Sequence, residues 1–237
     1  MLPVALPPQA GYNQPHYTAQ GEKRGNCGLL DIGNMLQIAY NPQMTTAIFS
    51  FGVFTDLHYG DGLYMDRHCM DGEEKLRACV AAFNERKLPL AIFLGDLIDS
   101  TSDHAGEVRN AVAMSKVYAT FQGERRMVLG NHDLCRLAKA EFLHAVGACP
   151  AEPYYSFDYH GVHFIVLDGN CHEDGSDFSA GNFQWDHAWV SPEQLRWLES
   201  DLARYSSCPT IVFIHENLER IQESGALDAH SVQNCAP

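Results

Sequence analysis

The chain has 237 residues, of which 46% are hydrophobic, and a formal net charge of −14. This length is enough for one domain with a buried core and too short for two domains of ordinary size. The acidic balance argues against a nucleic-acid backbone or an anionic membrane as the main partner. No apolar run approaches the roughly 20 residues of a transmembrane helix, and no signal peptide is evident.

The eight cysteines are spread along the chain and none forms a C-x-x-C pair, so we do not expect a structural zinc site. In a domain of this size, reduced thiols in a cytoplasmic protein are a simpler interpretation than disulfides. We therefore expect a cytoplasmic location. The composition leaves the oligomeric state open.

Residues 1–43 differ from the rest, because they are rich in proline, glutamine, glycine and asparagine and show no regular hydrophobic period. They fit a disordered or loosely packed extension. A second open interpretation is that Met44, just before the first apolar run, is the natural start. Residues 44–237 form the predicted domain, in which strands and helices alternate.

Short apolar runs predict buried strands at residues 48–55, 90–94, 127–129 and 210–214. Two further runs, Tyr154–Tyr159 and Val162–Asp168, flank His160-Gly161 and predict a hairpin. We therefore expect a mixed sheet, parallel in its first half and antiparallel afterwards. Residues 169–190 predict a long loop, and long loops in compact domains often carry function.

Four helices are predicted from capping signals and from apolar residues at helical spacing. Asp71 is a candidate N-cap, and Glu74 would complete a capping box with it. Ser191, followed by Pro192, is another helix start. The predicted helices begin after Asp71, at Ala105, at Leu134 and after Ser191, and the second and third end near Phe121 and Val146.

Each of the four apolar runs ends in residues that can bind a metal ion. These residues are Asp56 and His58, Asp96 and Asp99, Asn131 and His132, and His215. Polar strand caps would explain any one of them, but their repetition in one context favours a shared site at the edge of a sheet. Mixed oxygen and nitrogen donors suit manganese, iron or zinc. Two such ions about 3.5–4 Å apart can clamp a phosphoryl group and activate a bound water.

The four segments also resemble a known signature. In order and spacing, Asp56-x-His58, Gly95-Asp96-x-x-Asp99, Gly130-Asn131-His132-Asp133 and His215 resemble the calcineurin-like metallophosphoesterases. The resemblance implies an α/β fold, a four-layer sandwich of two mixed sheets flanked by helices. It also implies two divalent ions (manganese, iron or zinc) and a small phosphate ester or nucleotide-diphosphate substrate. Other segments are similar to the manganese-dependent ADP-ribose/CDP-alcohol diphosphatase branch and its bacterial relatives.

The resemblance assigns metal ligands within this pattern. Asp56 and His58 are expected to bind the first ion. Asn131 and His215 are expected to bind the second ion. Asp96 is expected to bridge the two ions, because a carboxylate has two oxygen atoms and can contact both.

The resemblance also assigns the proton transfer. His132 is expected to protonate the leaving oxygen rather than to bind metal, and Asp99 is expected to orient it. Three residues in the loop after Asp56 are candidate substrate contacts. These are Tyr59, Arg67 and His68.

One expected segment is missing from the pattern. Family members close the site with a Gly-His-x-His block, which supplies one histidine to each metal. The sequence ends at Pro237 without that block, and the setting of His230 does not match it. The sequence could be a fragment, a natural truncation with weakened metal binding, or a chain in which water or the N-terminal extension replaces the ligands. We favour truncation of a longer pattern, with one strand of the sheet missing as well.

Two functional hypotheses follow. The first is an enzyme that hydrolyses a phosphate ester or pyrophosphate bond through a hydroxide bound to two metal ions. The second is a catalytically impaired, truncated relative that binds one metal ion or a nucleotide without turnover. Neither hypothesis includes a nucleic-acid or membrane partner.

Overall fold

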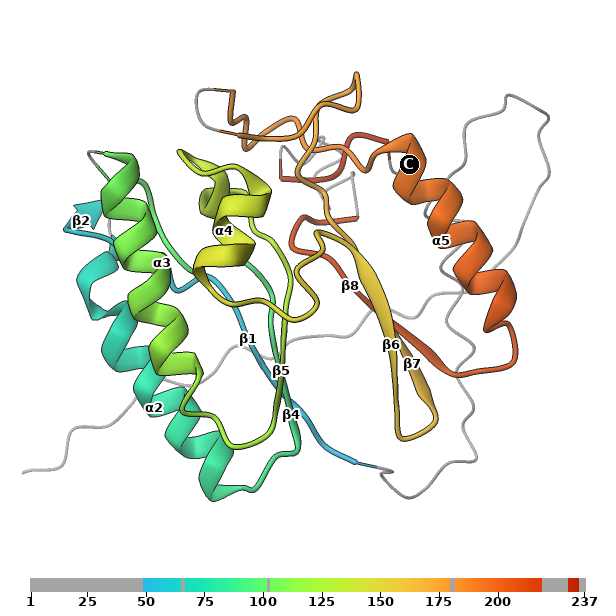
Figure 1. The fold of residues 1–237 in the computed structure, drawn as a ribbon, viewed down its shortest axis with the longest axis horizontal. Helices are drawn as coiled ribbons and strands as arrows, with labels where there is room; N and C mark the ends of the chain where they lie inside the picture. Colours follow the sequence, from blue (N-terminus) through green and yellow to red (C-terminus); the bar gives the residue numbers. More distant parts are fainter. Residues whose placement is uncertain (1–48, 65–66, 102, 180–181, 219–229, 235–237) are drawn as a thin grey trace, which may run out of the picture.

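Two sheets pack face to face in the computed structural model, which describes residues 49–64, 67–101, 103–179, 182–218 and 230–234 (Figure 1). Helices cover both outer faces. Three of them lie on the first sheet, namely α2 (Gly72–Glu85), α3 (His104–Tyr118) and α4 (Lys139–Ala145). Helix α5 (Pro192–Arg204) covers the second sheet. This arrangement confirms the predicted α/β sandwich of four layers.

The first sheet is parallel throughout its described strands. It has the order β1 (Gly52–Phe54), β4 (Leu90–Phe93) and β5 (Glu124–Met127). Phe54 pairs with Phe93, which pairs with Met127, so the three strands end at the same level. The residues that follow these strands therefore meet at one edge of the sheet.

The second sheet has the order β6 (Tyr155–Tyr159), β7 (Val162–Val166) and β8 (Thr210–Phe213). Strands β6 and β7 form the predicted antiparallel hairpin. Strand β8 pairs with β7 in parallel, so the prediction of an antiparallel second half is wrong for this strand. The reason is the crossover through α5, which returns the chain to the same end of the sheet. As a result, β8 also ends on the side of the molecule where β1, β4 and β5 end.

The predicted capping box of the first helix is not formed. A short 3-10 turn, Cys69–Asp71, runs directly into α2, and Asp71 already has helical backbone angles without a side-chain capping bond. Upstream of this turn, Leu63–Tyr64 and Arg67–His68 form the small antiparallel ribbon β2–β3. The N-cap prediction for Ser191 is confirmed, because its side chain accepts a hydrogen bond from the Gln194 amide.

Two other boundaries differ from the prediction. Helix α4 begins at Lys139 instead of Leu134, because His132–Leu134 form a 3-10 turn and an irregular segment follows. Strand β5 ends at Met127, where the predicted strand would start. Glu124 and Arg125 are exposed and the guanidinium of Arg126 lies over the Phe157 ring, so an apolar run was a poor guide to the position of this edge strand.

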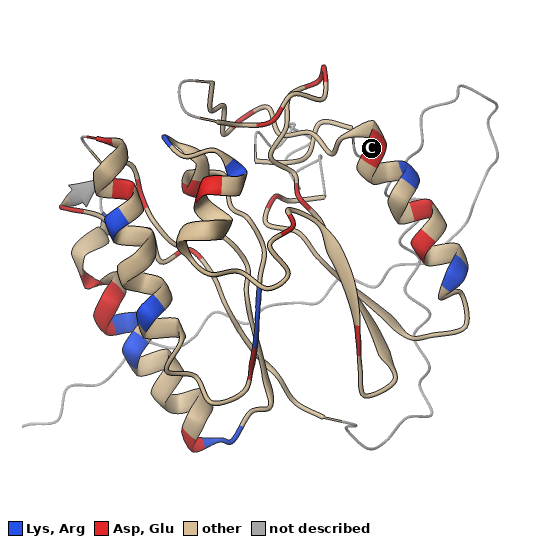
Figure 2. Ribbon diagram, in the orientation of Figure 1, with Lys and Arg blue, Asp and Glu red and all other residues tan. Residues whose placement is uncertain are grey.

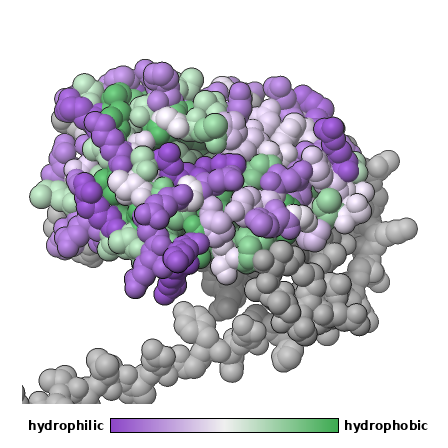
Figure 3. Space-filling view, turned by 60° about the horizontal axis from the view of Figure 1, so that its bottom comes forward, coloured by the Kyte–Doolittle hydropathy of each residue, from purple (hydrophilic) through white to green (hydrophobic). Residues whose placement is uncertain are grey.

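The hydrophobic core has an inner and two outer layers. Leu90 and Ile92 of β4 pack between the sheets against Phe164 and Val166 of β7. Outer clusters join the first sheet to α2, α3 and α4, and the second sheet to α5. Charged residues gather on α2, α3 and α5 (Figure 2). On the face seen in Figure 3, hydrophobic residues are scattered among hydrophilic ones.

None of the helices in the described part of the chain is long and apolar enough to cross a membrane. The predictions for residues 1–43 and for a start at Met44 fall outside the described residues.

We predict that the layer between the sheets dominates stability. Phe164 is fully buried and stacks on Phe157, with ring centroids 5.0 Å apart. Phe164→Ala should lower the free energy of unfolding by about 3–5 kcal/mol, because it opens a cavity between the sheets. Phe164→Leu, which fills more of the space, should lose less.

Denaturant unfolding followed by circular dichroism measures these changes. Val53→Ala is the control, because Val53 is 44% exposed on β1 and should change stability by no more than about 0.5 kcal/mol. Equal losses at Phe164 and Val53 would contradict the predicted core.

Candidate active site

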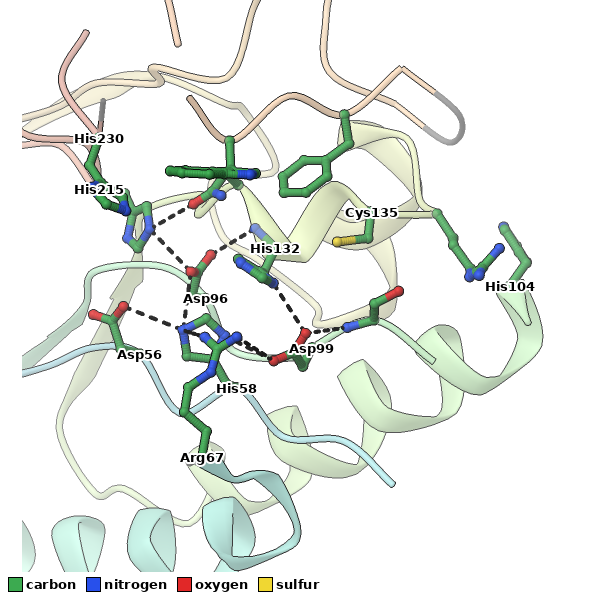
Figure 4. A pocket seen from close by; sticks show the side chains of 15 residues that line it. Asp56, His58, Arg67, Asp96, Asp99, His104, His132, Cys135, His215 and His230 are labelled. Carbon is green, nitrogen blue, oxygen red and sulfur yellow. Dashed lines mark hydrogen bonds and ion pairs between the residues drawn. The ribbon is translucent and has the colours of Figure 1, made fainter. Parts of the chain in front are cut away.

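The predicted ligands meet in one cavity at the edge where the strands end. Asp56 and His58 follow β1, Asp96 follows β4, Asn131 follows β5 and His215 follows β8. All five line a cavity of about 1080 Å³, together with Asp99 and His132 (Figure 4). The two sheets therefore bring together ligands that are up to 159 residues apart in the chain, from Asp56 to His215.

The backbone at three of these residues is unusual. Asp56, His58 and Asp96 have φ angles of 55°, 46° and 59°, in the left-handed region. Non-glycine residues seldom adopt this region, although Asp and His do so more often than most. Hydrogen bonds from the Asp56 amide to Gly95 O (3.1 Å) and from the His58 amide to Asp96 O (2.9 Å) hold the conformation. The turns aim the side chains into the cavity, and such local strain is concentrated at functional sites.

Two glycines allow the turns after β4 and β5 to touch. A Cβ atom on Gly95, whose φ is +100°, would lie 2.7 Å from the Gly130 backbone and 2.7 Å from His215 Nδ1. A Cβ on Gly130 would collide with the backbone nitrogen and the carboxylate of Asp96. Any larger residue would therefore push apart the segments that carry Asp96, Asn131 and His215.

One group of donors has the spacing that a metal ion requires. His58 Nε2 lies 3.5 Å from Asp56 Oδ1 and 3.4 Å from Asp96 Oδ2. Each of the three residues offers a donor atom within 4.8 Å of the others. Metal–ligand bonds of about 2.1 Å put neighbouring donors around a tetrahedral ion about 3.4 Å apart. The donors therefore fit a divalent ion in both chemistry and spacing.

A second group shares Asp96. His215 Nε2 lies 3.3 Å from Asp96 Oδ2 and 3.1 Å from Asn131 Oδ1. Its other nitrogen, Nδ1, donates to Leu94 O at 2.7 Å, which fixes the ring with Nε2 toward the cavity. Ligating histidines are commonly held in this way by a backbone carbonyl. Asp96 Oδ2 is thus nearly equidistant from His58 and His215, as a bridging carboxylate would be.

Charge within the site is balanced by protons when no ion is bound. Burial alone would lower the pKa of His58, but the neighbouring carboxylates of Asp56 and Asp99 outweigh it and raise the pKa to about 9. Burial is likewise outweighed at His215, where Asp96 raises the pKa to about 10. The hydrogen bond to His58 lowers the pKa of Asp56 to about 2. Carboxylates and imidazolium ions therefore pair at neutral pH.

His132 and Asp99 form the predicted pair beside these ligands. His132 Nδ1 lies 3.1 Å from Asp99 Oδ1, and the pKa of Asp99 is held well below its usual range because hydrogen bonds from His132 and His58 outweigh its burial. The backbone amide of His132 donates to Asp96 Oδ1 at 2.8 Å. His132, His58 and Asp99 also offer donor atoms within 4.8 Å of one another, so spacing alone does not distinguish an acid from a ligand here.

Arg67 is the one predicted substrate contact that lines the cavity. Its guanidinium lies 2.8 Å from His58 Nε2 and 3.3 Å from Asp99 Oδ2. Arg67 can donate to Nε2 only when that nitrogen is deprotonated, so the guanidinium, a proton and a metal ion compete for the same lone pair. Arg67 must therefore turn away when an ion binds His58.

The structure does not bring Tyr59 and His68 to the cavity. Tyr59 pairs with Ile98 through its backbone and packs against the core below α2. His68 is exposed on β3. Their proximity to Asp56 in the sequence does not bring them to the cavity, because neighbouring residues in this loop point in different directions.

Sequence reasoning missed other residues that line the cavity. They are Ser100, His104, Cys135, Arg136, Phe183, Trp185 and His230. Trp185 lies beside His230, with ring centroids 5.0 Å apart, and it is 47% exposed. The prediction of a long loop at residues 169–190 is the sequence signal for Phe183 and Trp185, because long loops in compact domains often carry function. Nothing in the pattern around His104 and Arg136 distinguished them from solvated helix residues.

The fold and its cluster of aspartate, histidine and asparagine donors define a metal-binding α/β sandwich of the phosphoesterase type. Residues 49–234 match the calcineurin-like phosphoesterase family, and the chain belongs to that family. A solved structure with a similar fold is that of a dimetal phosphatase from Danio rerio, with a TM-score of 0.61 and 16% identity over 78% of this chain and 76% of that one. Comparison with curated proteins finds no significant match.

We predict that metal binding releases protons. His58 and His215, with pKa values of about 9 and 10, carry protons at pH 7 that an ion must displace. For each proton displaced, affinity for Mn²⁺ should rise roughly tenfold per pH unit below these values. The metal-free protein should show the reverse trend in stability. The raised pKa values contribute stability that is complete below about pH 6.5 and is lost as the pH rises through about 9.

Calorimetric titration with Mn²⁺ in buffers of different ionisation enthalpy measures the number of protons released. His58→Gln should reduce that number, while His187→Gln, at an exposed histidine in the long loop, should not. Affinity that stays constant between pH 7 and 9 would contradict this account of the site.

Proposed function

We propose that this protein hydrolyses a phosphate ester or pyrophosphate bond with two divalent ions, manganese, iron or zinc. Membership of the family supports metal-dependent phosphoester hydrolysis in general. The observation that carries the proposal for this chain is Asp96 Oδ2, placed 3.4 Å from His58 Nε2 and 3.3 Å from His215 Nε2. One carboxylate between two imidazoles is the arrangement expected of a two-ion site.

Under this proposal, Asp56 and His58 hold one ion, Asn131 and His215 hold the other, and Asp96 holds both. When bound, the ions supply an activated water and neutralise charge on the phosphate oxygens. The turns at Asp56 and Asp96 fix the ligands before substrate arrives, so little reorganisation is needed during the reaction.

His132 is the proposed acid. Asp99 accepts a hydrogen bond from its Nδ1, which fixes the orientation of the ring. His132 can then give a proton to the leaving oxygen as the phosphorus–oxygen bond breaks. The bond from the His132 amide to Asp96 Oδ1 ties the acid to the bridging ligand, so the distance between them is set by the backbone.

Arg67 is proposed to contact the phosphate. One terminal nitrogen of Arg67 contacts His58 Nε2 and the other contacts Asp99. When the first contact is lost, the second keeps the guanidinium at Asp99. A planar guanidinium can pair with two phosphate oxygens at once. The substrate itself is proposed to be a small phosphate ester or nucleotide diphosphate, and the cytoplasmic location stays a prediction.

A protein that binds a single ion without turnover is the second candidate. The observation in its favour is that the two proposed metal positions have unequal sets of donor atoms. Asp56 and His58 give the first position a carboxylate and an imidazole of its own, whereas the second has His215 and only the neutral amide oxygen of Asn131. Among the described residues, the second position is the weaker one.

We predict that Asp96→Asn removes metal and activity together, because the bridging charge is lost from both positions. Metal content by elemental analysis and hydrolysis of bis-p-nitrophenyl phosphate with Mn²⁺ measure the two effects. Asp174→Asn, the same change in an exposed loop, is the control and should alter neither. Retained activity in Asp96→Asn would overturn the assignment.

His132→Gln should separate chemistry from binding. We expect kcat to fall by about 10² to 10⁴-fold, the usual contribution of a general acid, while the metal content stays at the wild-type value. Loss of metal from this variant would show instead that His132 is a ligand, as its spacing to His58 and Asp99 would also allow.

Metal stoichiometry distinguishes the two candidate functions. Two ions per chain with turnover are expected for the hydrolase. One weakly bound ion, with no turnover in Mn²⁺, Zn²⁺ or Fe²⁺, would favour the binding protein. Calorimetric titration of the metal-free protein, with the same sample assayed afterwards, gives both values.

A further inference from the structure

The cavity extends well beyond the candidate metal ligands. In Figure 4 the labelled residues run from Asp56 and His215 at one end, past His132 and Asp99, to Cys135 and His104 at the other. Arg136 lines the same cavity, one residue after Cys135. The proposed acid His132 thus stands between an acidic end, suited to cations, and an end that carries basic side chains.

Arg136 is anchored by one side of its guanidinium. Its Nε donates to Thr101 O at 2.8 Å, and its backbone amide donates to Glu107 Oε2 at 3.0 Å. Glu107 is fully buried in α3, and its Oε1 lies 3.6 Å from Arg136 Nε. These contacts restrain the side chain before any ligand arrives, which lowers the entropy lost on binding.

The two terminal nitrogens of Arg136 make no hydrogen bond within the described residues, and the side chain is 44% exposed. If the guanidinium served only to neutralise Glu107, its nitrogens would be expected to form a bidentate pair with that carboxylate. Instead, the Glu107 oxygens accept from the backbone amides of Thr101 and Arg136. The two terminal nitrogens of the guanidinium therefore remain available to a ligand in the cavity.

A second basic residue stands at the same end. His104 begins α3, and its Nε2 lies 3.2 Å from Glu141 Oε1 on α4. Its Nδ1 makes no hydrogen bond in the described part of the chain. His104 can thus add a donor beside Arg136, although Glu141 screens it and leaves Arg136 as the main positive charge.

We propose that Arg136, assisted by His104, binds a phosphate carried by the leaving group of the substrate. The inference rests on the proposed function, because His132 marks the side on which the leaving group departs. Substrates with a diphosphate link place a second phosphate on that side, whereas simple esters do not. Arg136 thereby becomes the residue that selects diphosphates over phosphate esters with uncharged leaving groups.

Two substrates of matched aromatic groups test this selection. In the hydrolysis of P1,P2-bis(p-nitrophenyl) diphosphate, the leaving group is the charged p-nitrophenyl phosphate. In the hydrolysis of bis-p-nitrophenyl phosphate, the leaving group is p-nitrophenol. Arg136→Gln should lower kcat/KM for the diphosphate by roughly 10- to 100-fold, mainly through KM, because a charged hydrogen bond of about 1.5–3 kcal/mol is lost. For the phosphate diester the change should stay within about threefold, since its leaving group carries no phosphate for Arg136 to bind. Products are quantified by liquid chromatography.

Matched variants exclude indirect effects. Arg136→Lys keeps the positive charge without the planar guanidinium. Its kcat/KM for the diphosphate should fall less than that of Arg136→Gln. Arg77→Gln, at an exposed arginine that pairs with Glu73 on α2, should change neither substrate. An equal loss on both substrates in Arg136→Gln, or no loss on either, would overturn the proposal.

A binding experiment separates this proposal from the proposed function. Calorimetry with Mn²⁺-loaded protein should show that inorganic pyrophosphate binds more tightly than inorganic phosphate, and Arg136→Gln should remove that margin. If the wild type hydrolyses neither substrate, the proposed function fails. The difference in affinity between pyrophosphate and phosphate still decides the role of Arg136. A margin that persists in Arg136→Gln would refute that role.

Discussion

The buried carboxylate of Asp133 is the interaction on which the site depends. It accepts backbone hydrogen bonds from Leu97 at 2.8 Å, Gly130 at 3.0 Å and Asp96 at 3.1 Å, and so joins the turns after β4 and β5. Burial and the nearby charge of Asp96 raise its pKa to about 7. Two carboxylates held this close repel each other, and bound divalent cations offset that repulsion. The backbone hydrogen bonds that shape the turns therefore also hold Asp133 against Asp96, the proposed bridging ligand.

The opposite wall of the cavity depends on a different buried pair. Lys139, at the start of α4, lies 2.6 Å from Asp168 after β7 and 2.6 Å from Asp177 in the long loop. The side chains of Lys139 and Asp168 are almost wholly buried, so removal of one partner would leave the other unpaired and costly. This pair joins the second sheet to the loop that carries Phe183 and Trp185 over the cavity. The contacts of Lys139 thus tie the first part of this loop to α4 and to the end of β7.

The sequence was a good guide where one physical rule sufficed. Parallel strands end at a common edge, so Asp56, Asp96 and Asn131 could be placed together from their positions after apolar runs. Side-chain direction could not be predicted in the same way. The left-handed backbone of His58 depends on a bond to Asp96 O, 38 residues away, and no local signal reports it. The same limit explains why Tyr59, one residue further on, faces the core instead of the substrate.

The residues missed from sequence share a cause. Arg136 looks like any solvated arginine until Glu107, 29 residues earlier, is seen to accept from its backbone amide. Buried carboxylates thus act twice in the segment from Gly130 to Arg136, because Asp133 fixes its beginning and Glu107 its end. Since the family pattern stops at Asp133, the proposed metal ligands follow from that pattern, whereas the position of Arg136 depends on contacts of this chain. The segment that carries Asn131, a proposed metal ligand, therefore also carries Arg136, the residue proposed to distinguish substrates.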